Sequence, residues 1–129
     1  MKQLLIEWKH YDKEGNTCVR CSNTGIALQR AISDLREDLK EKGIRIVFKE
    51  TKLSEDEIQA SNSIILNNVL LEDLLDDARK VETTCNSCCE LIGSDVSCRA
   101  LDCRGQTIED INVTLIKEAI NNLLRKEGL

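Results

Sequence analysis

Two cysteines separated by two residues, Cys18 and Cys21, are the residues of this sequence best suited to chemistry. They come just after a polar stretch and just before a helical pattern, so we expect them at the start of a helix. A helix N-terminus carries partial positive charge and unpaired N–H groups, so a thiol held there ionises more easily. Arg20, between the two cysteines, acts in the same direction. The pair predicts thiol chemistry, either as a redox couple or as ligands for a soft metal.

A second group of cysteines lies in the later half of the chain: Cys85, Cys88, Cys89, Cys98 and Cys103. Its first three members repeat the Cys-x-x-Cys spacing with one neighbour, and with Cys98 or Cys103 they could complete a four-sulfur site for zinc or an iron–sulfur cluster. Alternatively, one of them could exchange a disulfide with Cys18, which would make a relay of thiol pairs, or the group could be partly buried and inert.

His10 and Asp102 are the other candidate site residues. His10, the only histidine, lies near the end of a strand pattern and could stabilise a thiolate or add a metal ligand, unless it is a solvated strand-end side chain. Asp102 follows Cys98 by four residues. A thiolate beside a carboxylate can cleave a carbon–mercury bond, because sulfur captures the metal and the carboxyl delivers the proton. Otherwise Asp102 is a turn or strand-end residue.

The first fifty residues read as a strand, a helix and a second strand. Residues 2–10 alternate in a strand-like way, residues 24–42 have apolar side chains at helical spacing, and residues 44–49 are again strand-like. Ser22 and Thr24 are plausible caps for the helix, and Gly43 is a stop signal. Two strands joined in this way by a helix are expected to be parallel, with a right-handed crossover.

The rest of the chain predicts a hairpin, two short helices and a final helix. Residues 53–60 and 72–81 read as short charged helices, and Asn67-Asn68 is expected to form a tight turn between the strands 64–66 and 69–71. Residues 96–103 read as a strand with a turn at 104–106, and residues 113–124 read as an amphipathic helix. We expect one α/β domain over residues 1–129, with a mixed central sheet and a cysteine-rich insertion at about 82–104.

The composition excludes two classes of partner. A formal net charge of −5 with dispersed lysines and arginines argues against nucleic acid, which needs a basic face. The apolar start is interrupted by Glu7 and Lys9, so neither a signal peptide nor a membrane span is expected. Seven cysteines without an export signal predict a cytoplasmic protein with catalytic, redox or metal-binding thiols, and not a disulfide scaffold.

The order of strand, Cys-x-x-Cys, helix, strand, hairpin and final helix resembles the thioredoxin-like fold. That resemblance implies that Cys18 is the exposed nucleophile and that Cys21 resolves the mixed disulfide. Thioredoxins pack the pair against a cis-proline loop, for which Ser61-Asn62-Ser63 is the aligned place, but this sequence has no proline. A metal or cluster could therefore approach the two thiols more easily than in thioredoxins.

Short pieces along nearly the whole chain are similar to domain of unknown function 2703, a small cysteine-rich prokaryotic family. The pieces are Ile6-Glu7-Trp8-Lys9-His10, Thr17-Cys18-Val19-Arg20-Cys21, Glu50-Thr51-Lys52-Leu53, Ser61-Asn62-Ser63-Ile64 and Cys85-Asn86-Ser87-Cys88-Cys89-Glu90-Leu91-Ile92-Gly93. The resemblance implies a fold and no particular activity. The segment from Cys98 to Asp102 is faintly similar to organomercurial lyases, whose acid lies one residue closer to the cysteine.

Two functions are therefore open. The first is a thiol–disulfide redox protein that acts on protein or small-molecule thiols and disulfides, with the second cysteine group as a relay or a structural site. The second is a protein that binds or detoxifies a soft metal, such as zinc, an iron–sulfur cluster, mercury or arsenic, and it includes the organomercurial-lyase alternative. The metal ligands in that second case are Cys18, Cys21, Cys85, Cys88 and Cys89.

Overall fold

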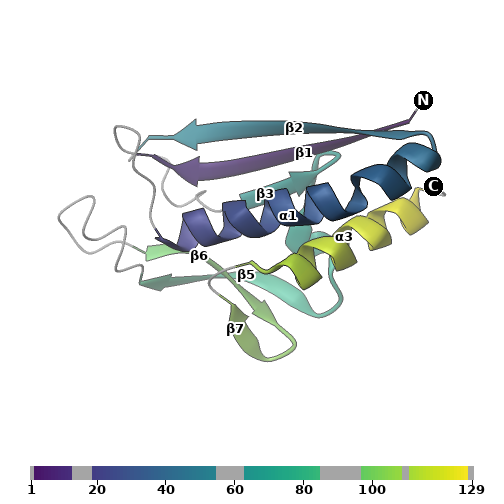
Figure 1. Ribbon diagram of the computed structural model, residues 1–129. Coiled ribbons are helices and arrows are strands. Elements are labelled where there is room, and N and C mark those ends of the chain that lie inside the picture. Colours follow the sequence, from purple (N-terminus) through teal and green to yellow (C-terminus); the bar gives the residue numbers. More distant parts are fainter. Residues whose placement is uncertain (1, 13–18, 55–62, 85–96, 109–110, 128–129) are drawn as a thin grey trace.

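The computed structural model describes residues 2–12, 19–54, 63–84, 97–108 and 111–127, with residues 19–21, 82–84 and 97–99 described by their backbone alone. These residues form a mixed α/β structure with two helices and two sheets (Figure 1). The elements in chain order are β1 (Lys2–Tyr11), α1 (Val19–Glu41), β2 (Ile44–Leu53), β3 (Ser63–Leu66), β4 (Val69–Leu70), the 3-10 helix η2 (Leu71–Leu74), β5 (Ala78–Thr84), β6 (Ser97–Cys103), β7 (Gln106–Ile108) and α3 (Val113–Lys126).

The first sheet has the strand order β2-β1-β3-β4 and mixes parallel with antiparallel pairs. β1 and β2 are parallel over their whole length, from Lys2 opposite Ile44 to Tyr11 opposite Leu53. β3 is antiparallel to β1, and it leads into the antiparallel β4 through a hairpin. The predicted strand-helix-strand unit, the hairpin and the mixed sheet are confirmed.

One face of this sheet carries the core. Along β1 the side chains of Leu4, Ile6, Trp8 and His10 are buried, because they lie on the face toward the helices. α1 lies against this face, and α3 packs alongside α1 (Figure 1). The core is aliphatic, as an aromatic content of 2% predicts. Its largest fully buried side chains are Leu4, Ile6, Leu28, Ile32, Leu39, Ile64, Leu66, Leu71, Leu101, Ile116, Ile120 and Leu123.

The second sheet corrects two predictions from sequence. A single central sheet was expected, but β5, β6 and β7 form a separate antiparallel sheet on the opposite side of the helices from β1 and β2 in Figure 1. The predicted helix over 72–81 is also wrong. Only Leu71–Leu74 turn helically, Asp77 takes a left-handed conformation with φ of 55°, and the chain then extends into β5. The pairing of β5 with β6 outweighs the helical spacing of the apolar residues in this stretch.

The start of α1 also differs from the prediction. The helix begins at Val19 and not at Thr24, so Ser22 and Thr24 lie inside it and are not its caps. Thr24 is completely buried, and its hydroxyl oxygen accepts a hydrogen bond from the backbone N–H of Ile111 at 3.2 Å. That bond joins α1 to the segment that enters α3. The predicted helix over 53–60 starts on the last residue of β2, and its residues 55–60 lie outside the described part.

Two tight turns behave as the sequence predicts. Asn67 and Asn68 turn the β3–β4 hairpin with φ of 48° and 67°, and Arg104 and Gly105 turn the β6–β7 hairpin with φ of 53° and 83°. Glu118 of α3 holds the second turn by accepting a hydrogen bond from Arg104 at 2.6 Å, and this bond and the charge of Glu118 raise the pKa of the Arg104 guanidinium.

Over the described residues, neither helix combines the length and apolarity that crossing a bilayer requires.

Candidate functional site

The Cys-x-x-Cys motif stands at the start of α1. Cys18 lies outside the described residues, while Arg20 and Cys21 are the second and third residues of the helix and are described by their backbone. β1 and β2 end together, at Tyr11 and Leu53. α1 begins at the same end of the molecule, at the left of Figure 1. The first turn of α1 therefore lies beside the carboxyl ends of two parallel strands.

An open hollow of about 530 Å³ lies between these strand ends and the beginning of α1. α1 contributes a stripe of four residues at helical spacing, while β1, β2 and the residue after β1 contribute the opposite wall. Ile26, on the α1 side, is 62% exposed and is the one large hydrophobic side chain exposed among the described residues. The lining residues are Trp8, His10, Asp12, Ser22, Gly25, Ile26, Gln29, Glu50 and Lys52.

His10 is the most enclosed polar group of this hollow. Its side chain is only 2% exposed, so the alternative of a solvated strand-end residue is wrong. Nε2 lies 2.6 Å from a carboxylate oxygen of Glu50, and Nδ1 lies 3.3 Å from the carbonyl oxygen of Tyr11. The imidazole also stacks on the indole of Trp8, with ring centroids 3.9 Å apart and an interplanar angle of 20°. Three neighbours therefore fix the orientation of this ring.

Gly25 lets α1 approach β1 closely at this point. A Cβ atom on Gly25 would stand 2.5 Å from Cη2 of Trp8 and 2.9 Å from Cζ2 and Cζ3. No side chain fits into that space unless the indole moves. Gly25 therefore lets Trp8 pack against the second turn of α1. His10 stacks on Trp8 and is held close to the helix in the same way.

Sequence reasoning found His10 but missed its partners. Glu50 reads in the sequence as the start of a solvated acidic stretch, and Trp8 as a core residue. The parallel register places Trp8 directly opposite Glu50 and His10 opposite Lys52, so all four share one face of the sheet. Alternation along both strands, combined with the predicted parallel pairing, is the signal that could have found Glu50.

The second cysteine group is only partly described. Cys85, Cys88 and Cys89 lie outside the described residues, and Cys98 is described by its backbone in β6. Cys103 is a free thiol, 4% exposed and packed in the core. Cys98 and Cys103 are five positions apart on an extended strand, or about 16 Å. One metal ion cannot bind both.

β5 and β6 relate this group to α1. Thr84, the last residue of β5, pairs with Ser97, the first residue of β6. In Figure 1 this end of the second sheet lies at the same end of the molecule as the start of α1. The segment that contains Cys85, Cys88 and Cys89 therefore leaves and re-enters the described structure at the end where α1 begins.

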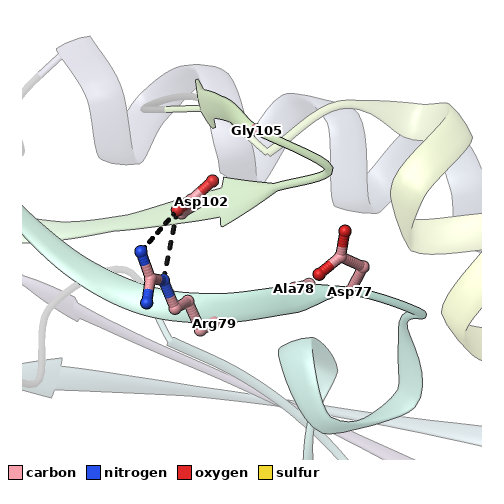
Figure 2. Close-up of a pocket in the computed structure, with 5 residues that line it drawn as sticks. All are labelled: Asp77, Ala78, Arg79, Asp102 and Gly105. Carbon is pink, nitrogen blue, oxygen red and sulfur yellow. Dashed lines mark hydrogen bonds and ion pairs between the residues drawn. The ribbon is translucent and has the colours of Figure 1, made fainter.

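Asp102 belongs to a different place. It lines a hollow of about 290 Å³ with Asp77, Ala78, Arg79 and Gly105 (Figure 2). Arg79 reaches across from β5 and binds the same carboxylate oxygen of Asp102 through two nitrogens, at 3.1 and 3.0 Å. Asp102 and Cys98 are four positions apart on the strand, or about 13 Å. This spacing and the ion pair argue against direct proton delivery by Asp102 at Cys98.

Within the described ranges, no three His, Cys, Asp or Glu side chains come close enough together to hold a metal ion. The cysteines expected from sequence to bind a metal lie outside these ranges or are described there by their backbone, apart from Cys103. The arrangement that the described side chains do build is a buried histidine–carboxylate pair beside the beginning of a helix that carries a cysteine motif.

Comparison with known proteins identifies relatives but no activity. A family model described as Domain of unknown function (DUF2703) matches residues 4–120. An uncharacterized protein of Archaeoglobus fulgidus is 37% identical over 118 residues, which cover 88% of this chain and 82% of the relative. No solved structure matches. The similarity to the family that the sequence pieces indicate is thereby confirmed.

Proposed function

The chain belongs to the family described as Domain of unknown function (DUF2703), and we propose that it is a thiol–disulfide redox protein. The observation that carries the proposal is that Cys21 is the third described residue of α1, at the end of this helix that lies beside the carboxyl ends of β1 and β2. Thiols at helix N-termini ionise more easily, and the thiolate is the form that attacks disulfides. The hollow beside this turn offers space for a reacting group.

We also propose that the fold is thioredoxin-like. The order β1-α1-β2, then the β3–β4 hairpin and α3, is the order on which that resemblance rests, and the first sheet has the mixed pairing expected of it. The sheet β5-β6-β7 stands between the hairpin and α3 as an addition to that core. It is the counterpart of the cysteine-rich insertion.

In the proposed reaction Cys18 attacks and Cys21 resolves. The Cys18 thiol loses its proton, and its thiolate attacks one sulfur of a substrate disulfide, so that a mixed disulfide forms and one substrate thiolate leaves. The Cys21 thiolate then attacks Cys18 and releases the second substrate thiolate. The motif is oxidised to a disulfide by two electrons, the substrate is reduced to two thiols by the same two electrons, and the protons of the two protein thiols end on the substrate.

The proposed setting is the cytoplasm, where the reducing thiol pool keeps cysteines free. The partners are protein or small-molecule disulfides and thiols, and neither nucleic acid nor a membrane is among them. Cys85, Cys88, Cys89 and Cys98 of the second cysteine group act as a relay that exchanges electrons with the motif or as a structural site, while Cys103 stays in the core. Thr84 and Ser97, the paired strand residues on either side of Cys85, Cys88 and Cys89 in the sequence, lie at the end of the molecule where α1 begins. This position favours exchange between the two groups.

A soft-metal protein is the second candidate, and one observation favours it. The chain contains no proline, so no cis-proline covers the two thiols as it does in thioredoxins. Open thiolates at this spacing bind zinc, an iron–sulfur cluster, mercury or arsenic as readily as they attack a disulfide. Cys18, Cys21, Cys85, Cys88 and Cys89 would be its ligands.

Anaerobically purified protein decides between the two candidates. Redox function predicts a metal-free protein that reduces a dye-labelled disulfide peptide, loses this activity in Cys18→Ser, and accumulates a mixed disulfide at Cys18 in Cys21→Ser. Cys103→Ala, which removes a thiol from the core, is the matched control and keeps the activity. Stoichiometric metal that is lost in Cys18→Ser supports the second candidate. Metal-free wild type without reductase activity refutes both.

A further inference from the structure

β2 leaves one edge of the first sheet open. It is the outer strand of the order β2-β1-β3-β4, and within the described part of the chain it pairs with β1 alone (Figure 1). The backbone N–H of Lys2 donates to the carbonyl oxygen of Gly43 at 2.9 Å, and at the other end of the pair Leu53 accepts a backbone hydrogen bond at 3.3 Å. Backbone groups alternate in direction along a strand, so every second residue between these two acceptors turns its N–H and C=O toward β1.

The intervening residues Ile44, Ile46 and Phe48 turn their N–H and C=O away from β1, and no described residue pairs with these groups. Their side chains lie on the face of the sheet that carries the core, since Ile46 is opposite the buried Leu4 in the register. Ile44 is buried, whereas Ile46 and Phe48 are half-buried. A strand added beside β2 would therefore form main-chain hydrogen bonds and cover two half-buried apolar side chains.

The last part of α1 adds a cationic wall to this edge. A hollow of about 320 Å³ lies between α1 and the beginning of β2, and it is lined by Arg36, Lys40, Ile44, Arg45 and Ile46. Arg36 and Lys40 are exposed on one face of the helix, and no carboxylate of the described residues pairs with either of them. The guanidinium of Arg45 donates to Gln3 at 3.3 Å, so the unpaired cations of the hollow are Arg36 and Lys40.

The charge at this edge favours an acidic partner over a second copy of the chain. Like charges four residues apart on a helix repel each other, so Arg36 and Lys40 cost helix stability unless an anion lies between them. β2 itself carries three cations and one carboxylate, although the whole chain has a formal net charge of −5. A second β2 would bring the same positive charge to the interface, whereas a strand with carboxylates would be attracted.

We propose that the open edge of β2 and the end of α1 bind an extended acidic segment of another protein. The segment adds as a strand beside β2 and places a carboxylate side chain between Arg36 and Lys40. About five residues, at about 3.3 Å each, reach from Ile44 to Phe48. Main-chain hydrogen bonds supply affinity, while the carboxylate and an apolar side chain over Ile46 supply selectivity. This surface goes beyond the redox function and does not depend on it.

Amide NMR of isotope-labelled protein tests the proposal. The probe is an acetylated and amidated peptide of about six residues in which glutamate alternates with valine, so that its side chains alone carry charge. It should shift the amide signals of Ile46 and Phe48 and slow their exchange with solvent. The amides of Arg45 and Val47 already face β1 and should exchange as in the free protein. The same peptide methylated at its backbone nitrogens should lose this binding, because it cannot pair as a strand.

The charge contribution is tested by two matched changes. Arg36→Gln combined with Lys40→Gln should weaken binding of the probe about ten-fold or more, and so should glutamine in place of glutamate in the peptide. The control is Arg125→Gln combined with Lys126→Gln, which removes two exposed cations from the last turn of α3 and should bind the probe as the wild type does.

Four results would overturn the proposal. They are a probe that does not bind at millimolar concentration, equal affinity for the glutamine peptide, equal weakening in the control variant, and binding that leaves the exchange of Ile46 and Phe48 unchanged. Protection of these two amides in the free protein, together with tumbling that slows as its concentration rises, would assign the edge to a second copy and equally overturn it.

Discussion

Gly25→Ala should destabilise the protein, although the same change inside an ordinary helix is stabilising. Gly25 is an interior residue of α1, where alanine is favoured over glycine by about 1 kcal/mol. Here the new Cβ would stand 2.5 Å from Cη2 of Trp8. The indole cannot easily move, because it is only 8% exposed and stacks on His10.

The balance of two effects sets the magnitude. Forcing an extra methyl group into a packed site costs roughly 1–3 kcal/mol. Subtracting the helix-propensity gain of about 1 kcal/mol leaves a net loss of about 0–2 kcal/mol in the free energy of unfolding. The strain falls on Trp8 and through it on His10, so the native fluorescence of the single tryptophan should change as well.

Urea unfolding followed by circular dichroism measures the loss, and tryptophan emission reports the displaced ring. Gly43→Ala is the matched control. Gly43 has φ of 77° and nothing within 4 Å of the added methyl, so this change costs backbone strain of about 1 kcal/mol and leaves the emission unaltered. Combining Gly25→Ala with Trp8→Phe should recover part of the loss. The close packing would be refuted if Gly25→Ala raised the free energy of unfolding by the full helix-propensity gain of about 1 kcal/mol and left the tryptophan emission unchanged.

Three hydrogen bonds yield the remaining predictions, each measured by urea unfolding. Asn67→Ala removes the side-chain oxygen that accepts from a backbone N–H of β1 at 2.7 Å and should cost about 1–3 kcal/mol, while Asn67→Asp should cost less. Thr24→Val leaves the buried Ile111 N–H without its hydroxyl acceptor and should cost about 1–3 kcal/mol, whereas Thr24→Ser keeps the bond; equal losses would contradict it. Asn112→Ala removes the cap of α3, for about 1 kcal/mol, and Asn112→Asp should retain it.

Local patterns made the first half of the fold predictable. Alternation along β1, helical spacing through α1 and the stop at Gly43 each carry their own signal, and a strand-helix-strand order implies a parallel pair. The Asn67-Asn68 turn is equally local. Such elements depend on neighbours in the sequence, so one sequence is enough to find them.

The errors have a long-range cause. Thr24 has the chemistry of a cap, but its hydroxyl is engaged by Ile111, 87 residues away, and α1 starts one turn earlier. Residues 78–81 have helical spacing, but pairing with β6 extends them. The partnership of His10 with Glu50 likewise depends on the register between β1 and β2, across 40 residues of sequence. None of these contacts can be found from a single stretch of the sequence.

The strand geometry of β6 narrows what the seven cysteines can do together. Cys103 lies in the core beside Ala78 in the register, at the far end of β6 from Ser97. Cys98 is one residue from the end at which α1 begins, so it is the strand cysteine that could join the motif in a relay or a metal site. A site shared by both cysteine groups would thus draw on Cys98 and exclude Cys103, because a shared metal tolerates sulfur distances of only about 2.3 Å to each ligand.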